Sequence, residues 1–242
     1  MRQHRTSVRW GSSSKGHPLS PYELVLGDQL SQLHPLSPYE LVVGDQLSQL
    51  HPRLQAYFRA IPEGHHGVGT GTFQTVGTPR RWLWPILWIL ERQGVLFPVW
   101  ERDVPFTVIN RPRVGAAGRP AVTATRTFHT RAGERRMRDA ITTLGGGLVD
   151  YLGTRRRYRA ELIASVERGR LTMTSTSLAV RLGSAWLPVP RWLAPRVSLS
   201  ERFDEQLGQQ RVSVTTSVPG IGRVYEYTGS FVYELRQDGG AQ

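Results

Sequence analysis

Apolar and polar residues alternate at every second position over much of the chain after residue 67, and this period of two constrains the fold more than any other feature. Residues 158–167 are a clear case, because one parity is apolar while the other is mostly charged or hydroxylated. Residues 167–170 include a glycine and predict a tight turn into a second strand at residues 171–173. The pattern therefore predicts a half-buried β-hairpin.

The last predicted strand, residues 225–233, has a stripe of aromatic side chains on one parity, formed by Tyr225, Tyr227, Phe231 and Tyr233. Further predicted strands cover residues 68–76, 104–110, 121–130, 147–153, 196–204 and 210–218. About nine sequential strands joined by short glycine-containing turns favour a large curved antiparallel β-sheet or a barrel over alternating β and α units. We expect the aromatic stripe to face inward.

Near the N-terminus, residues 17–33 recur as residues 34–50 with one change, Leu26 against Val43. Ser37 and Glu40 form a capping box that predicts a helix start, and an apolar stripe follows at helical spacing. The stripe consists of Tyr39, Val43, Leu47 and Leu50. Prolines at the join prevent one long helix. We expect the second copy to dock on the core and the first copy to lie loosely outside it.

The Trp-rich segment, residues 79–94, interrupts the series of strands with a second helix or an irregular amphipathic stretch. Its candidate functional residues are Arg80, Arg81, Trp82, Trp84 and Trp88. Trp beside Arg suits a membrane interface, which predicts peripheral membrane contact. The alternative is a lid that covers the open end of a curved sheet.

These elements together predict an α+β fold, in which an N-terminal helix packs on a large curved antiparallel β-sheet or barrel under the Trp-rich helical lid segment. We expect a flexible tail at residues 1–36, a single domain at residues 37–236 and a disordered C-terminus at residues 237–242.

Composition limits the function classes. The formal charge is +12, but of 31 basic residues only Lys15 is a lysine, and the arginines are scattered without a known nucleic-acid-binding motif. We therefore do not expect nucleic acid as a partner. The chain has no cysteine, and its basic N-terminus is not followed by an apolar run, which predicts no secretory signal and a cytoplasmic location.

Cofactor and catalytic motifs find little support. Gly67, Gly69 and Gly71 resemble a dinucleotide-binding loop, but Thr72 occupies the position of its third glycine and no strand precedes it. The common hydrolase, zinc-protease and P-loop motifs are missing from the sequence. We expect no cofactor and no metal.

Two charged residues occupy apolar parities. Arg126 shares its face with Val122 and Phe128, and Glu201 shares its face with Leu199 and Phe203. A buried charge without a partner costs several kcal/mol, about the same order as breaking a buried ion pair. We therefore expect Arg126 and Glu201 to pair with each other. The pair is either structural or a polar anchor at the base of an apolar ligand cavity.

Several phrases resemble an uncharacterised bacterial family catalogued as domain of unknown function 4166, over about residues 37–235. The matching pieces are residues 39–44 and 50–51, Arg126-x-Phe128, Leu187-Pro188, Leu193-x-Pro195, Glu201, Val218-Pro219-x-x-Gly222 and Tyr227-x-Gly229. The chain departs from the family pattern at Ala124 and at residues 150–153. The family also occurs fused to reductases that resemble saccharopine dehydrogenase, which implies a reductase as a partner.

The leading hypothesis is non-catalytic binding of a hydrophobic small molecule in the concavity of the sheet, with Arg126, Glu201, Tyr225, Tyr227 and Phe231 as ligand-binding residues. The first alternative is an enzyme, or an accessory domain of a reductase, that acts on a lipophilic substrate. The second is a peripheral membrane-binding module. Whether the chain is an enzyme stays open from the sequence.

Overall fold

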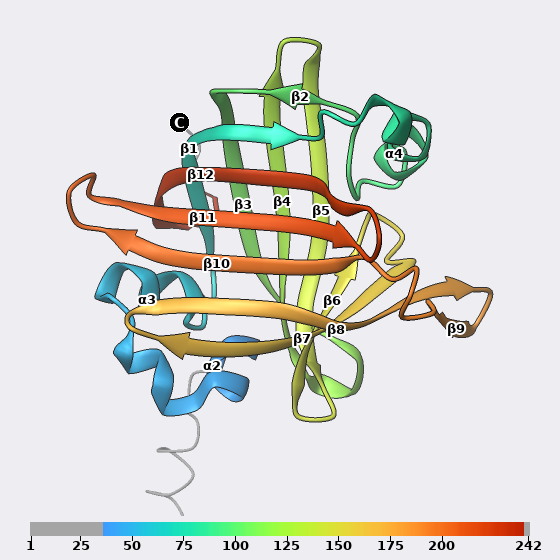
Figure 1. The fold of residues 1–242 in the computed structure, drawn as a ribbon. Helices are drawn as coiled ribbons and strands as arrows, with labels where there is room; N and C mark the ends of the chain where they lie inside the picture. The colour runs from blue at the N-terminus through green and yellow to red at the C-terminus, as the bar shows by residue number, and fades with distance from the viewer. Residues whose placement is uncertain (1–35, 240–242) are drawn as a thin grey trace, which may run out of the picture. The chain divides into compact units, whose positions relative to one another are not determined.

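The computed structural model describes residues 36–239, which fold into a mostly β architecture (Figure 1). The first copy of the repeat, most of the expected tail and residues 240–242 lie outside the described residues. The strands are β1 (His65–Gly77), β2 (Trp100–Glu101), β3 (Val104–Val114), β4 (Pro120–Thr130), β5 (Gly133–Leu144), β6 (Gly147–Leu152), β7 (Tyr158–Glu167), β8 (Arg170–Leu182), β9 (Ala185–Pro188), β10 (Arg196–Asp204), β11 (Gln209–Val218) and β12 (Gly222–Gln237).

The strands form one antiparallel sheet that closes on itself. Neighbours follow the order β10, β11, β12, β1, β3, β4, β5, β6, β7, β8 and β9, and β10 also pairs with β8. This extra pairing makes a ring of ten strands, because the short β2 and β9 pair outside it. Of the two architectures that the alternation favoured, the structure is therefore the barrel.

All nine expected strands are present, and the expected hairpin turn between β7 and β8 is confirmed. Arg168 and Gly169 both have positive φ, as the two central residues of a type I′ turn require. The expected strand series omitted β5, which carries five charged residues among positions 134–139. Its arginines at 136 and 138 face outward, whereas Met137, Ala140 and Ile141 are buried.

The helical part is smaller than an α+β class implies. It comprises α2 (Pro38–Val43), η1 (Gly44–Gln49), α3 (Pro52–Phe58), η2 (Arg81–Leu83), α4 (Trp84–Glu91) and the single turn η3 (Ala116–Gly118). The expected N-terminal helix is broken, because Gly44 ends α2 with a positive φ and Pro52 restarts the chain as α3. No helix in residues 36–239 is long and apolar enough to cross a bilayer.

The N-terminal segment is nevertheless anchored as its pattern predicted. The capping box of Ser37 and Glu40 is present, and the Ser37 hydroxyl also donates to the Phe58 carbonyl oxygen at 2.5 Å. The predicted apolar stripe is buried throughout and packs on side chains from β5 to β8. The hydrogen bond between Ser37 and Phe58 joins α2 to α3, and the packing of the stripe fixes both against the barrel.

Because successive strands run in opposite directions, their connections alternate between two ends of the barrel. At one, called the α3 end, Gln49 lies beside Gly169, and His51 pairs with Glu205 at 3.1 Å. The other, called the α4 end, holds residues 78–99 and the connections at residues 153–157 and 183–195. In Figure 1 the α2–α3 segment and α4 lie on different sides of the barrel.

Candidate functional site

The barrel interior contains a cavity of about 310 Å³, called the central cavity. Side chains from α2, α3, α4 and the segment after it, strands β4 to β8 and β10 to β12, and the connection between β9 and β10 line it, and most of them are apolar. Its deep wall includes the buried Ile141, Leu162 and Met173, whereas lining residues at the α4 end, such as Val95 and Val189, are partly exposed. The cavity therefore opens toward the α4 end.

Arg126 reaches the central cavity from β4 and forms an ion pair through Nη1 with Oδ2 of Asp139 on β5. Ala124 lies opposite Asp139 in the antiparallel register, so Arg126 and Asp139 are diagonal neighbours on the inner face. Burial alone would lower the pKa of the guanidinium, but the charge of Asp139 helps to raise that pKa above its ordinary value. The predicted pairing of Arg126 with Glu201 is wrong, because Asp139 takes the guanidinium.

Glu201 lines the same cavity from β10, and only 4% of the residue is exposed. Its Oε2 accepts a hydrogen bond from Nε2 of the buried Gln210 on β11. Burial raises the pKa of the Glu201 carboxyl from the ordinary 4.5 to about 7, although Gln210 and Arg126 both oppose the rise. The carboxyl can therefore hold or release a proton near neutral pH.

Asp150 on β6 is a third acidic group at the central cavity, and the sequence reasoning missed it as a site residue. Its Oδ1 is shielded from solvent and has no hydrogen-bond partner among the described residues. Burial, followed by the nearby charge of Asp139, raises the pKa of this carboxyl well above its ordinary value. The signal was present in the sequence, since Asp150 shares its parity with the apolar Leu148 and Leu152.

The aromatic stripe of β12 divides between the cavity and the solid core. Tyr227 lines the central cavity, and burial raises its pKa to about 12. Tyr225 lies outside that lining, and its hydroxyl donates to the Phe97 carbonyl oxygen at 3.1 Å. Phe231 packs against Phe106 and lines only a small adjoining cavity of about 20 Å³, which Arg126 and Glu201 also line.

The Trp-rich segment separates into inward and outward side chains. Leu87 of α4 is buried and Leu90 lines the central cavity, so α4 covers part of the barrel end. Trp84 packs on the core, and the Arg81 guanidinium lies 5.6 Å from its ring centroid. Trp82 and Trp88, by contrast, are both more than half exposed.

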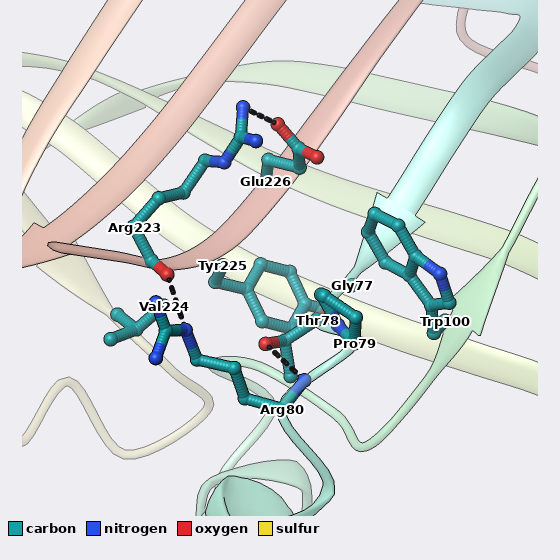
Figure 2. A pocket seen from close by; sticks show the side chains of 9 residues that line it. All are labelled: Gly77, Thr78, Pro79, Arg80, Trp100, Arg223, Val224, Tyr225 and Glu226. Carbon is teal, nitrogen blue, oxygen red and sulfur yellow. Dashed lines mark hydrogen bonds and ion pairs between the residues drawn. The ribbon is translucent and has the colours of Figure 1, made fainter. Parts of the chain in front are cut away.

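Arg80 belongs to a second pocket of about 210 Å³, which shares no lining residue with the central cavity. Figure 2 shows this pocket where the end of β1 meets the start of β12. The Arg80 Nε donates to the Arg223 carbonyl oxygen at 3.1 Å, and Arg223 pairs with Glu226 at 2.7 Å. These contacts tie the start of the Trp-rich segment to the barrel wall.

Comparison with known proteins gives a family but no activity. The chain is 26% identical over 182 residues to the "Uncharacterized protein YndH" of Bacillus subtilis (strain 168). The aligned region covers 72% of this chain and 86% of the relative. No solved structure matches the chain. The model of the family described as "Domain of unknown function (DUF4166)" matches residues 50–231, and the chain therefore belongs to that family.

Proposed function

We propose that this barrel binds a hydrophobic small molecule in the central cavity. The observation that supports ligand binding is the cavity of about 310 Å³, which is lined mostly by apolar side chains and contains a few buried polar groups. This volume lies at the lower end of the range for small-molecule sites, which are roughly 300–1,000 Å³. The apolar body of the ligand packs on residues such as Leu162 and Met173, and its polar group meets the charged residues.

The charges favour a ligand whose polar group is neutral or basic. Three carboxyl groups, those of Asp139, Asp150 and Glu201, line the cavity, and the guanidinium of Arg126 already pairs with Asp139. The second arginine of the lining, Arg138, is exposed to solvent. A carboxylate buried among these groups would add a negative charge where the buried cation of the lining, Arg126, is already paired. A hydroxyl or an amine instead donates a hydrogen bond to the unpartnered Oδ1 of Asp150.

Native mass spectrometry of the purified full chain tests this proposal, because a co-purifying lipophilic molecule gives a defined mass increase. A displacement assay with an alcohol, an amine and a carboxylic acid of equal chain length then tests the preferred polar group. We expect the acid to bind weakest. Equal affinity for all three compounds would contradict the charge argument.

A Leu178→Trp variant narrows the cavity at a partly exposed lining position of β8, and we expect it to lose the ligand while keeping the fold. Ile163→Trp is the matched control, because Ile163 lies on β7 and is 65% exposed on the outer face. An empty wild-type protein that displaces no probe would overturn the proposal.

Glu201 favours a second candidate, an enzyme that acts on a lipophilic substrate. A buried carboxyl with a pKa of about 7 beside a charged guanidinium can exchange a proton with a bound molecule. Incubating the protein with its co-purified ligand and following the ligand by mass spectrometry separates the two candidates. Turnover that Glu201→Gln abolishes without loss of binding selects the enzyme, and an unchanged ligand selects the binding protein.

A further inference from the structure

Exposed tryptophans gather at the α4 end of the barrel. Six tryptophans lie in the described residues, and Trp82, Trp88, Trp100 and Trp192 are exposed, up to 70% for Trp192. Trp82, Trp88 and Trp192 belong to the segments at this end, and Trp100 on β2 directly follows the first of these segments. Trp is enriched where proteins meet the membrane–water interface, because its ring is apolar and its N–H is polar.

Aliphatic side chains extend this exposed apolar surface. Ile86 and Ile89 on α4 are both more than half exposed, and Leu187 and Leu193 lie in the connection from β8 to β10. Exposed large apolar side chains occur singly on most proteins, but a concentration at one end marks an interaction surface.

The same end is strongly basic. Three segments, residues 80–96, 153–157 and 181–196, carry three arginines each and together contain one acidic residue, Glu91. Glu91 is already paired with Arg135 at 2.9 Å. None of these nine arginines forms a salt bridge with a residue in the described part of the chain. We call the three segments together the Arg–Trp rim.

The α3 end lacks this charge pattern. Residues 36–64, which cover that end, contain three acidic residues and two arginines. The segment that covers the α3 end therefore does not share the excess of arginine found in the three segments at the α4 end.

The Arg–Trp rim also surrounds the opening of the central cavity. Leu90 and Val95 come from its first segment and Val189 and Pro195 from its third, and all four line the cavity. The segments are joined directly, since the Thr154 amide donates to the Gln93 carbonyl oxygen and the Arg181 amide donates to the Arg157 carbonyl oxygen, both at 2.8 Å. A surface that meets the rim thus meets the cavity opening.

We propose that the Arg–Trp rim docks on the surface of an anionic lipid bilayer. The arginines neutralise lipid phosphates, and the exposed Trp and Ile side chains enter the interfacial region. A nucleic acid would also attract the arginines, but it offers no apolar layer for Ile86 and Ile89. Docking places the cavity opening at the source of lipophilic molecules, and it goes beyond ligand binding because the rim attracts a bilayer whether the cavity is filled or empty.

Co-sedimentation of the full chain with phosphatidylcholine vesicles, with and without phosphatidylglycerol, tests this docking. We expect binding only to vesicles that contain phosphatidylglycerol, and we expect it to weaken at high salt. Exchanging Arg155, Arg156 and Arg157 for Gln should lower the partition coefficient for the vesicles on the order of 100-fold. Each arginine near an anionic surface raises that coefficient roughly fivefold, and three of them are removed. Trp88→Ser with Trp192→Ser should abolish binding.

The charge-matched control exchanges Arg53, Arg113 and Arg170 for Gln, three exposed arginines away from the rim. This control removes the same net charge and should keep most of the vesicle binding. Equal losses in the control and the rim variant, or no binding to either vesicle, would overturn the docking proposal. Binding to an RNA or DNA duplex that outcompetes the vesicles would also overturn it.

The ligand-displacement assay, run in buffer without vesicles, keeps the two proposals separate. Rim variants should bind the soluble probe as the wild type does, and Leu178→Trp should lose the probe but keep its vesicle binding. Loss of vesicle binding in Leu178→Trp, with the fold intact by circular dichroism, would count against a rim that acts on its own.

Discussion

Replacing Glu201 with Gln removes a carboxyl that the barrel holds away from water. In the folded protein burial raises the pKa of this group from the ordinary 4.5 to about 7, so the folded state takes up a proton more readily than the unfolded chain. The contribution of the protonated Glu201 carboxyl to the free energy of unfolding is fully present below pH 4.5 and is lost as the pH rises through 7. The wild type should therefore become less stable, relative to Glu201→Gln, between these two values.

The size of the effect follows from the two pKa values. One pKa unit corresponds to about 1.4 kcal/mol, so a rise from 4.5 to about 7 gives a limit of about 3 kcal/mol, most of which falls between pH 5 and pH 8. Gln keeps the shape of the side chain, and its amide oxygen still accepts from Gln210. The loss of the charge is thus the main change.

Urea unfolding of both proteins at several pH values measures this difference, because subtracting the two curves cancels the titration of all other groups. The exposed Glu167 at the end of β7 is the matched control, and Glu167→Gln should leave the pH dependence unchanged. If the curves of the wild type and Glu201→Gln run parallel from pH 5 to pH 8, the carboxyl is hydrated and the reasoning from burial is refuted.

Three further predictions concern stability. Arg126→Met should lower the free energy of unfolding, measured in urea, by about 3–5 kcal/mol, because it leaves Asp139 unpaired. Adding Asp139→Asn should restore most of that loss, whereas additive losses would show that the two residues are not coupled. Gly153→Ala should cost about 1–3 kcal/mol, since its new Cβ would lie 2.6 Å from the Gln93 carbonyl oxygen, whereas Gly146→Ala, with a similar φ and open space, should cost less by thermal melting. Deleting residues 17–33 should leave the melting temperature unchanged, and a marked drop would mean that the first repeat copy also docks.

The strands were predictable because their alternation is local. A chain that places apolar residues at every second position and glycine at the turns specifies each hairpin by itself, as the turn at Arg168 and Gly169 shows. Barrel closure was not predictable, because it depends on pairing β8 with β10 across a connection that contains β9. β5 was absent from the predicted strands, and its charged residues obscure the alternation of apolar and polar positions; its outer face is in water, and Asp139 has a partner inside.

The candidate site was predictable only in part, because the pairing of its side chains depends on contacts between strands. Charge on an apolar parity identified Arg126 and Glu201, and the structure brings both to the central cavity. The partner of Arg126 depends on the register between β4 and β5, which the sequence does not reveal. Helical periodicity likewise identified the buried face of the N-terminal segment, but Gly44 and Pro52 decided that this segment is not one helix.

The pairing of β1 with β12 has a consequence for how the protein is made. Among the strands that the structure describes, β1 leaves the ribosome first and β12 last, and they share a register from His65 with Gln237 to Gly77 with Glu226. Until translation has passed β12, the nascent chain keeps a β1 edge that can pair with a second chain. A premature stop before residue 222 would leave that edge open permanently, so truncated products should aggregate rather than fold into smaller barrels.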